Sequence, residues 1–348
     1  MLEPPPVPRS PWQRLYGAAH AARRSYWSRR ARRLPRPVVS IGNLAWGGTG
    51  KTPVTAALAR HLVGRGLRIA ILSRGYGSAG KGVRLVSRGD GPLLGPRVAG
   101  DEPVLLAGLA PGAAVVVCPD RHRAGQHAAE RLDPPPDLFL LDDGFSHLPL
   151  ARDLDLLLFP AADPFAGGRL APGGRLREPL VASRRAHAAL LTGALREDDG
   201  RRLAKALRPH GFEGPGFVSR TRLGSPRWIA DEAPLAAGTL VVAVAGIARP
   251  AGFFAAARAA DLRVVEEIAF GDHHGYPTGS LERIRRAVAR HGAQAVLGTG
   301  KDRVKLQGRL DLPLAELPLR ADPEPSFFAW LDDRLDALRT AAQRLKDA

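Results

Sequence analysis

Short apolar runs alternate along the chain with stretches of helical periodicity, and glycine loops separate them. The first such unit is an apolar run at 38–43, a glycine loop, a helical stretch at 51–66 and a second apolar run at 67–75. Strand, helix and strand in this order form a βαβ unit, whose two strands are parallel. Further strand-like runs lie at 113–118, 137–143, 154–159 and 187–193. We therefore expect an α/β fold built on a P-loop NTPase-like parallel sheet.

The pattern weakens at 207–238, which is rich in proline, glycine and arginine. A second α/β pattern then begins, with apolar runs at 239–246, 263–270 and 293–300 and helical stretches near 250–260, 280–291 and 326–346. We predict that the junction separates two units. These are a core domain at 38–222 and a smaller α/β domain at 223–348, which includes the closing helix.

The segment 1–37 combines aromatic residues with arginine. Apolar side chains recur there at helical spacing, namely Trp12, Leu15, Tyr16, Ala19, Ala22 and Tyr26, and arginines occupy much of the remaining face. This spacing predicts an amphipathic helix, which Pro35 and Pro37 would end. Two interpretations stay open: the stripe enters a membrane interface, or it packs on the protein's own core.

The chain of 348 residues is strongly basic, with 51 Lys and Arg against 34 Asp and Glu and a net charge of +17. Nearly half of this excess lies in 1–37. A hydrophobic fraction of 45% excludes a disordered polycation. The charge therefore requires an anionic partner, and nucleic acid, a membrane surface and an anionic small substrate are the candidates.

Cysteine content and hydropathy indicate the compartment. Cys118 is the single cysteine, so an intramolecular disulfide is impossible and a reducing compartment fits. The first residues lack the pattern of a signal peptide, and no stretch has about 18 consecutive apolar residues. We expect a protein of the cytosol without a transmembrane span.

The strongest motif is GGTGKT at 47–52, which lies between a predicted strand and a predicted helix. Glycines let backbone N–H groups surround phosphate oxygens, a lysine reaches the β and γ phosphates, and a threonine hydroxyl can ligate Mg²⁺. Ala45 stands where the usual motif has its first glycine. The alternative interpretation is a structural glycine turn that ends in Lys-Thr by chance. The predicted nucleotide-binding residues are Ala45, Trp46, Gly47, Gly48, Thr49, Gly50, Lys51 and Thr52.

Paired aspartates follow a later apolar run. Asp142 and Asp143 come directly after the run at 137–141. Taken alone, such a pair is typical of a turn or a helix cap. Together with Lys51 and Thr52, it favours a Mg²⁺ site beside the P-loop.

Two glycine-flanked polar motifs remain. GDEP at 100–103 contains Asp101 and Glu102, and FGDHHGY at 270–276 contains Asp272 and His273. Phosphoryl transfer to a hydroxyl needs a positioned base, and a carboxylate supported by histidine is suitable. The alternative for each motif is a loop with a helix cap or a solvated histidine.

Taken together, the motifs resemble one family, the tetraacyldisaccharide 4'-kinases, which are lipid A 4'-kinases. The resemblance extends from Trp12 to Leu306 and depends on the order and spacing of the motifs. These are the aromatic-basic helix, VVSIGNLAWGGTGKTP, SRGYG, GDEP, DDGFSHLPLARDLDLLLF, GGRLREPL, AGIARPAGFF, FGDHH and TGKDRVKL.

The resemblance implies ATP-dependent phosphorylation of the 4'-hydroxyl of a tetraacylated glucosamine disaccharide 1-phosphate. It implies Mg²⁺ as cofactor and a peripheral position on the cytosolic face of the inner membrane. Lys51 and Thr52 would hold phosphates and metal, Asp142 and Asp143 would serve the metal, and Asp101 would be the base, with His273 of the Asp272-His273 pair beside it. Lesser candidates, for contact with substrate or phosphate, are Arg74, His147, Arg177 and Glu178.

The chain departs from the family pattern at three positions. Ser146 stands where the family usually has Gln, Gly271 where it has Pro, and Gly300 where it has Glu. One rival hypothesis is therefore a non-catalytic relative that binds lipid or nucleotide. The other is a nucleic-acid-dependent P-loop ATPase, but aromatic residues are only 6% of the chain and do not interleave with the basic residues of the core. We expect no nucleic-acid partner, and the sequence leaves the oligomeric state open.

Overall fold

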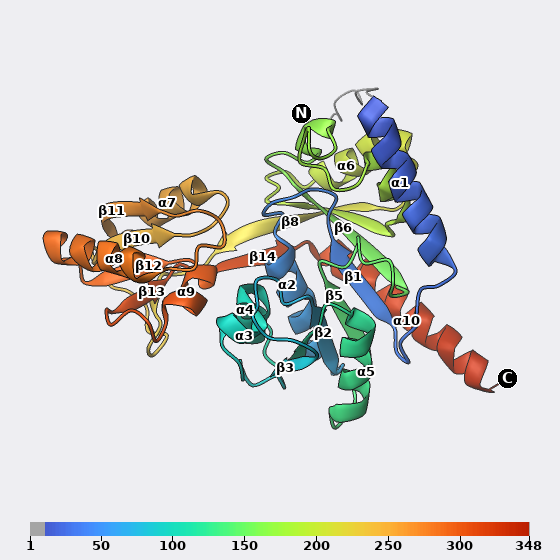
Figure 1. Ribbon diagram of the computed structural model, residues 1–348, viewed down its shortest axis with the longest axis horizontal. Coiled ribbons are helices and arrows are strands. Elements are labelled where there is room, and N and C mark those ends of the chain that lie inside the picture. The colour runs from blue at the N-terminus through green and yellow to red at the C-terminus, as the bar shows by residue number, and fades with distance from the viewer. Residues whose placement is uncertain (1–10, 348) are drawn as a thin grey trace.

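The computed structural model describes residues 11–347 and contains two sheets joined by extended strands (Figure 1). The start of the predicted N-terminal segment, 1–10, lies outside the described residues. The larger sheet has nine strands in the order β14-β8-β7-β6-β1-β5-β2-β4-β3. Their bounds in that order are Leu319–Pro323, Gly216–Leu223, Ala188–Thr192, Leu154–Pro160, Val38–Gly42, Leu138–Asp142, Ile69–Ser73, Ala113–Val117 and Arg84–Ser87.

The larger sheet is parallel apart from its two edge strands, β3 and β14, which pair antiparallel with their neighbours. Every residue of β1, β2, β4 and β5 is buried, as expected for strands covered by helices on both faces. This confirms the predicted α/β fold with a parallel core. The helices of this unit include α2 (Lys51–Gly64), α3 (Pro96–Ala99), α4 (Asp101–Leu109), α5 (Arg121–Arg131) and α6 (Asp199–Leu207).

The smaller sheet has five strands in the order β11-β10-β12-β13-β9. Only β9 runs antiparallel to its neighbour. In spatial order the strands are Arg263–Ala269, Leu240–Ala245, Ala295–Gly298, Leu314–Glu316 and Arg227–Trp228. Its core includes side chains of α7 (Pro250–Arg258) in one cluster and of α8 (Thr278–His291) and α9 (Gly300–Leu306) in another.

Two strands connect the sheets. The chain leaves the larger sheet along β8 and returns along β14, and these strands pair with each other from Ser219–Pro323 to Leu223–Leu319 (Figure 1). The structure therefore places β8 and β9 inside 207–238, where the weak periodicity predicted only a junction. Exposed, arginine-rich residues in the outer half of β8 hide the apolar alternation on which strand prediction depends.

The closing helix α10 (Pro325–Asp347) belongs by packing to the larger sheet. Phe327, Leu331 and Leu335 are buried in the same core cluster as Val54 and Leu58 of α2. We therefore propose to count α10 with the core unit rather than with the smaller α/β unit to which the sequence assigns it.

The N-terminal helix α1 (Pro11–Ser28) ends before Pro35, so the two prolines do not terminate it. Its apolar stripe is divided between the core and the surface. Tyr16 packs against a core cluster and donates a hydrogen bond to the carbonyl of Arg177 at 3.2 Å. Trp12, Leu15 and Tyr26 are 49%, 63% and 52% exposed. Within residues 11–347, no helix combines the length and apolarity needed to span a membrane.

The end of β1 depends on a glycine. A Cβ on Gly42 would lie 2.5 Å from Cβ of Phe145 and 2.7 Å from its backbone nitrogen, so the substitution must push apart β1 and the loop after β5. We expect Gly42→Ala to lower the free energy of unfolding by about 1–3 kcal/mol, because overpacking a close contact costs that much. Urea denaturation measures the effect.

The matched control is Gly64→Ala in α2, where a Cβ would meet nothing within 4 Å. Alanine favours helix over glycine, so this control should leave stability unchanged or raise it by up to about 1 kcal/mol. Equal stability of the two variants would show that the close approach of Gly42 and Phe145 is unimportant.

Candidate functional site

The P-loop connects the end of β1 to the start of α2. Gly47 and Gly50 have positive φ, 107° and 78°, so both adopt a backbone conformation that favours glycine. Gly50 immediately precedes the helix and has no side chain to cap it, which leaves the first N–H groups of α2 available to an anion. The hydroxyl of Thr49 is buried without a hydrogen-bond partner, although its carbonyl accepts from Thr192 at 2.9 Å. The loop therefore presents hydrogen-bond donors suited to an anion.

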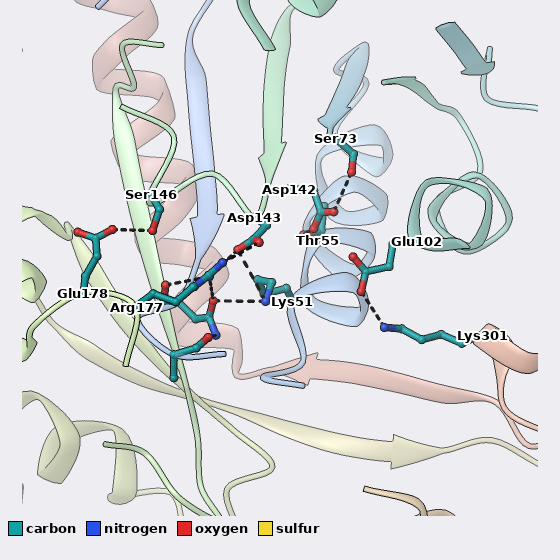
Figure 2. A network of polar contacts seen from close by, with 12 residues as sticks. Lys51, Thr55, Ser73, Glu102, Asp142, Asp143, Ser146, Arg177, Glu178 and Lys301 are labelled. Carbon is teal, nitrogen blue, oxygen red and sulfur yellow. Dashed lines mark hydrogen bonds and ion pairs between the residues drawn. The ribbon is translucent and has the colours of Figure 1, made fainter. Parts of the chain in front are cut away.

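Lys51, the first residue of α2, reaches back over this loop. Its Nζ donates to Oδ1 of Asn43 at 3.3 Å and lies 3.7 Å from Oδ1 of Asp143 (Figure 2). Arg177 donates to both carboxylate oxygens of Asp143, at 2.9 and 3.1 Å, and also contacts Asn43. Two cations thus meet one carboxylate and one amide at the end of β1.

The paired aspartates sit in opposite electrostatic environments. Asp142 ends β5, is 2% exposed, and accepts hydrogen bonds from Thr55 at 3.3 Å and Ser73 at 3.2 Å. Burial, helped by the nearby charges of Glu102 and Asp143, raises the pKa of Asp142 to about 7. Burial also raises the pKa of Asp143, but Lys51 and Arg177 outweigh it and lower this pKa to about 2.

The side chains of Thr52, Asp142 and Asp143 fit as ligands of a magnesium ion that also binds phosphates. Mg²⁺ is typically held by one or two carboxylates, with waters and phosphate oxygens completing an octahedron. Thr52 and Asp142 are buried beside the P-loop. Among residues 11–347, no group of three or more His, Cys, Asp and Glu side chains forms a metal site. Thr52 and the two aspartates therefore suit a Mg²⁺ ion whose remaining ligands are phosphate oxygens and waters.

The two remaining motifs meet across the two sheets. Asp101 is the first residue of α4, and Nδ1 of His273 lies 3.7 Å from its Oδ2. Nε2 of His273 is 3.9 Å from Oδ2 of Asp272. These separations exceed a hydrogen bond, but catalytic contacts are often long before substrate binds. Neighbouring His274 instead contacts Ser280 at 2.9 Å.

The lesser candidates lie in different surroundings. Glu178 is buried and accepts from Ser146 at 2.5 Å and from Arg185 at 2.6 Å. Burial, with Arg121 nearby, lowers the pKa of His147 to about 3, and its Nε2 has no hydrogen-bond partner. Arg74 is exposed in the loop after β2. Arg177 contacts Asn43 and Asp143 through its side chain, whereas Glu178 reaches the P-loop through its backbone N–H, which donates to the carbonyl of Leu44 at 3.3 Å.

Sequence reasoning missed several residues of the site. Asn43 follows β1 and contacts both Lys51 and Arg177. Arg121 begins α5 in a buried position, where desolvation and Arg74 lower its pKa to about 10. Lys301 and Lys305 contact the GDEP carboxylates. The rarity of lysine, six of 51 basic residues, is the signal that could have found the last two.

Comparisons with known proteins agree on one family. The family model described as tetraacyldisaccharide-1-P 4'-kinase, LpxK, matches residues 9–336. The chain is 44% identical over 303 residues to the tetraacyldisaccharide 4'-kinase of Geobacter sulfurreducens, covering 85% of this chain and 83% of that protein. The protein of the same name from Anaeromyxobacter dehalogenans is 41% identical over 325 residues, with 91% and 80% covered.

A solved structure has the same fold. The crystal structure of LpxK from Aquifex aeolicus in complex with ATP matches with a TM-score of 0.72 and 30% identity. The match covers 93% of this chain and 97% of that one. At this identity and coverage, the likeness extends over both sheets.

The raised pKa of Asp142 predicts a pH dependence of stability. The unfolded carboxyl titrates near pH 4 and the folded one near 7, so the folded state binds the extra proton. The contribution of the protonated Asp142 carboxyl to stability is therefore fully present below about pH 4 and is lost as the pH rises through 7. We expect Asp142→Asn to remove this loss and to exceed the wild type in unfolding free energy at pH 8 by at most about 4 kcal/mol.

Urea denaturation of the nucleotide-free, Mg²⁺-free protein between pH 5 and 8 measures the effect. Asp90→Asn is the control, because Asp90 is exposed. Parallel pH curves for Asp142→Asn and the wild type would contradict the prediction.

Proposed function

Because the chain belongs to the tetraacyldisaccharide 4'-kinase family, kinases of lipid A biosynthesis, we propose that it transfers the γ-phosphoryl group of ATP to the 4'-hydroxyl of a tetraacylated glucosamine disaccharide 1-phosphate. Family membership confirms the resemblance carried by the motifs. The observation that carries the residue assignments is the convergence of Lys51, Asp142 and Asp143 at one sheet edge with Asp101 and His273 nearby.

The P-loop is proposed to bind the ATP phosphates. The N–H groups at the start of α2 and the hydroxyl of Thr49 would donate to phosphate oxygens. Lys51 would exchange its contacts with Asn43 and Asp143 for the β and γ phosphates. Arg177, whose guanidinium lies 5.3 Å above the ring of Trp46, is positioned to bring a second cation to the same charge.

Thr52, Asp142 and Asp143 would hold Mg²⁺. When bound, the ion neutralises charge that develops on the transferring phosphoryl group. The protein's part is to keep Asp143 ionised through Lys51 and Arg177 and to orient Asp142 through Thr55 and Ser73.

Asp101 is the proposed general base, with His273 beside it. The 4'-hydroxyl oxygen would form a bond to the γ-phosphorus while the bond from that phosphorus to the β–γ bridging oxygen breaks. ADP leaves with the bonding electrons, and the hydroxyl proton passes to Asp101. Glu178, His147 and Arg74 remain proposed contacts of the disaccharide or its phosphate, grouped by their motifs rather than by a contact in this structure.

Substitutions separate these roles. We expect Lys51→Ala to lower turnover by at least about 100-fold, because it removes a charge that stabilises the transition state. Asp101→Asn should lower kcat by about 10²–10⁴-fold, the usual contribution of a general base. The assay follows transfer of labelled phosphate from ATP to the lipid disaccharide 1-phosphate in mixed micelles.

Lys81→Ala and Asp90→Asn are the matched controls, since both side chains are exposed outside the site, and both should retain turnover. Wild-type turnover by Asp101→Asn would remove Asp101 as the base. Full activity of Lys51→Ala would contradict the nucleotide site itself.

The N-terminal helix supports a peripheral membrane position, which we propose as the enzyme's place of action. Trp12, Leu15 and Tyr26 leave apolar surface exposed on α1, and Arg30 lies 4.4 Å from the ring of Tyr26. Aromatic rings and arginines together suit an anionic lipid interface. An acylated substrate embedded in a membrane would require such a surface.

We expect the double variant Leu15→Ser, Tyr26→Ser to bind phosphatidylglycerol vesicles at least about 30-fold more weakly, because burial of each of the two apolar side chains contributes about 1–2 kcal/mol. Co-sedimentation measures binding. Leu93→Ser, at a residue 54% exposed outside α1, is the control. Equal vesicle binding by the double variant would exclude α1 as the anchor.

A further inference from the structure

The TGKDRVKL motif forms a contact between the two sheets that the function above does not use. It begins α9 in the smaller unit, and its two lysines face the GDEP motif at the start of α4. Nζ of Lys301 donates to Oε1 of Glu102 at 2.7 Å (Figure 2), and Nζ of Lys305 lies 2.8 Å from Oδ2 of Asp101. Lysines four residues apart share one face of a helix, so α9 presents both cations to two adjacent carboxylates.

Lys305 is buried and Lys301 is partly buried. The side chains of Lys305 and Asp101 are 5% and 21% exposed, and those of Lys301 and Glu102 are 25% and 28% exposed. Burial raises the pKa of Glu102, but Lys301, followed by Lys51 and His273, outweighs it and lowers this pKa below its ordinary value. Glu102 is therefore ionised at neutral pH, and its pairing with Lys301 is charge-assisted.

Asp302 fixes the orientation of α9. It is fully buried and accepts hydrogen bonds from the N–H of Gly246 at 2.9 Å, from the hydroxyl of Tyr276 at 2.7 Å and from that of Thr299 at 2.7 Å. Tyr276 lies three residues after His273 in the same loop. The lysines and His273 are thus presented by one connected support.

The glycine of the motif permits the close approach. A Cβ on Gly300 would lie 3.0 Å from Cδ1 of Leu105 in α4 and 3.1 Å from Oε1 of Glu316. Glycine at this position lets the first turn of α9 pack tightly on α4. The departure from the family pattern at Gly300 therefore accompanies a packed contact rather than a loose one.

We propose that Lys305 is a positioning residue that orients the carboxylate of Asp101 for proton transfer. The ion pair of Lys301 with Glu102 is a second contact that attaches α9 to α4. The closest approaches of Lys305 and His273 are both to Oδ2 of Asp101. Oδ1 is then the oxygen that accepts the proton of the acceptor hydroxyl. This inference rests on the proposed function, because it acts through Asp101 as the base.

The attachment has a physical reason. A carboxylate on a helix terminus can rotate about χ1 and χ2, and an oriented base reacts faster than a rotating one. An ammonium group at 2.8 Å, itself held by a buried stem, restricts that rotation. The restriction exists only while α9 lies on α4, so it also makes proton transfer depend on the contact between the two units.

The first test measures kcat and KM of Lys305→Met. We expect kcat to fall about 10- to 100-fold while KM for ATP stays within about two-fold, because the nucleotide phosphates are bound elsewhere. Lys305→Arg, which keeps the charge, should recover part of the lost kcat. Lys205→Met, at an exposed lysine of α6, is the matched control and should match the wild type. A kcat of Lys305→Met within two-fold of wild type would overturn the proposal.

The second test places Lys305→Met in the Asp101→Asn background. If Lys305 acts through Asp101, it should cause no further loss there, because the base is already gone. Equal fold-losses in both backgrounds would overturn the proposal, and would indicate a merely structural role. Lys305→Gln replaces Lys305→Met in both tests if thermal melting shows that the methionine variant does not fold.

The outcomes separate this inference from the function on which it rests. An inactive Asp101→Asn beside a fully active Lys305→Met rejects the role of Lys305 alone. A fully active Asp101→Asn rejects the base itself, and with it the inference.

Discussion

The site depends on the direction of the strands in the larger sheet. Because β1, β2 and β5 are parallel neighbours, their carboxyl ends lie at one edge. Ser73 and Asp142 are the last residues of β2 and β5, the P-loop follows β1, and Ile41 is in register with Asp142. The parallel sheet alone therefore brings together residues that are up to about a hundred positions apart in the sequence. The close approach of Gly42 to Phe145 then determines how near the P-loop lies to the loop after β5.

Within this edge, the protein keeps two adjacent carboxylates in different states. Asp143 is held ionised by two cations, whereas the carboxylate of Asp142 is desolvated and accepts hydrogen bonds from the hydroxyls of Thr55 and Ser73. Two full negative charges side by side without a cation would be costly. Lys51 and Arg177 balance the charge of Asp143 in this structure. In the proposed mechanism the same two cations would also contact the phosphates of ATP.

The sequence predicted the parts of the molecule where local pattern and burial agree. Each of the apolar runs that became β1, β2, β4, β5, β6 and β7 is almost wholly buried, so the pattern is continuous. It missed β8 and β9, where arginine-rich residues interrupt the apolar pattern. It grouped α10 with the smaller unit, whereas the helix packs in the core of the larger one, because periodicity does not say which sheet a helix covers. The P-loop could also be predicted, because its glycines and its lysine lie within six neighbouring positions, 47–52.

The contacts between the two units could not be predicted in that way. Asp101 and Lys305 are about two hundred residues apart, and the sequence of neither motif predicts their contact. Their meeting depends on β8 and β14, which carry the chain out and back. The family resemblance suggested that His273 lies beside Asp101, and the geometry brings them to 3.7 Å. It suggested nothing about the lysines, although they make the shorter contacts.

The choice of lysine at these points has a chemical basis. This chain uses arginine for most of its positive charge, with six lysines among 51 basic residues, and three of the six are Lys51, Lys301 and Lys305. Guanidinium is planar and tends to bind both oxygens of a carboxylate, as Arg177 does with Asp143. Ammonium is compact and can approach one oxygen while the other stays available. In the proposed mechanism, Asp101 keeps one oxygen for its substrate and Lys51 exchanges its protein partners for phosphate oxygens, and both roles suit an ammonium group.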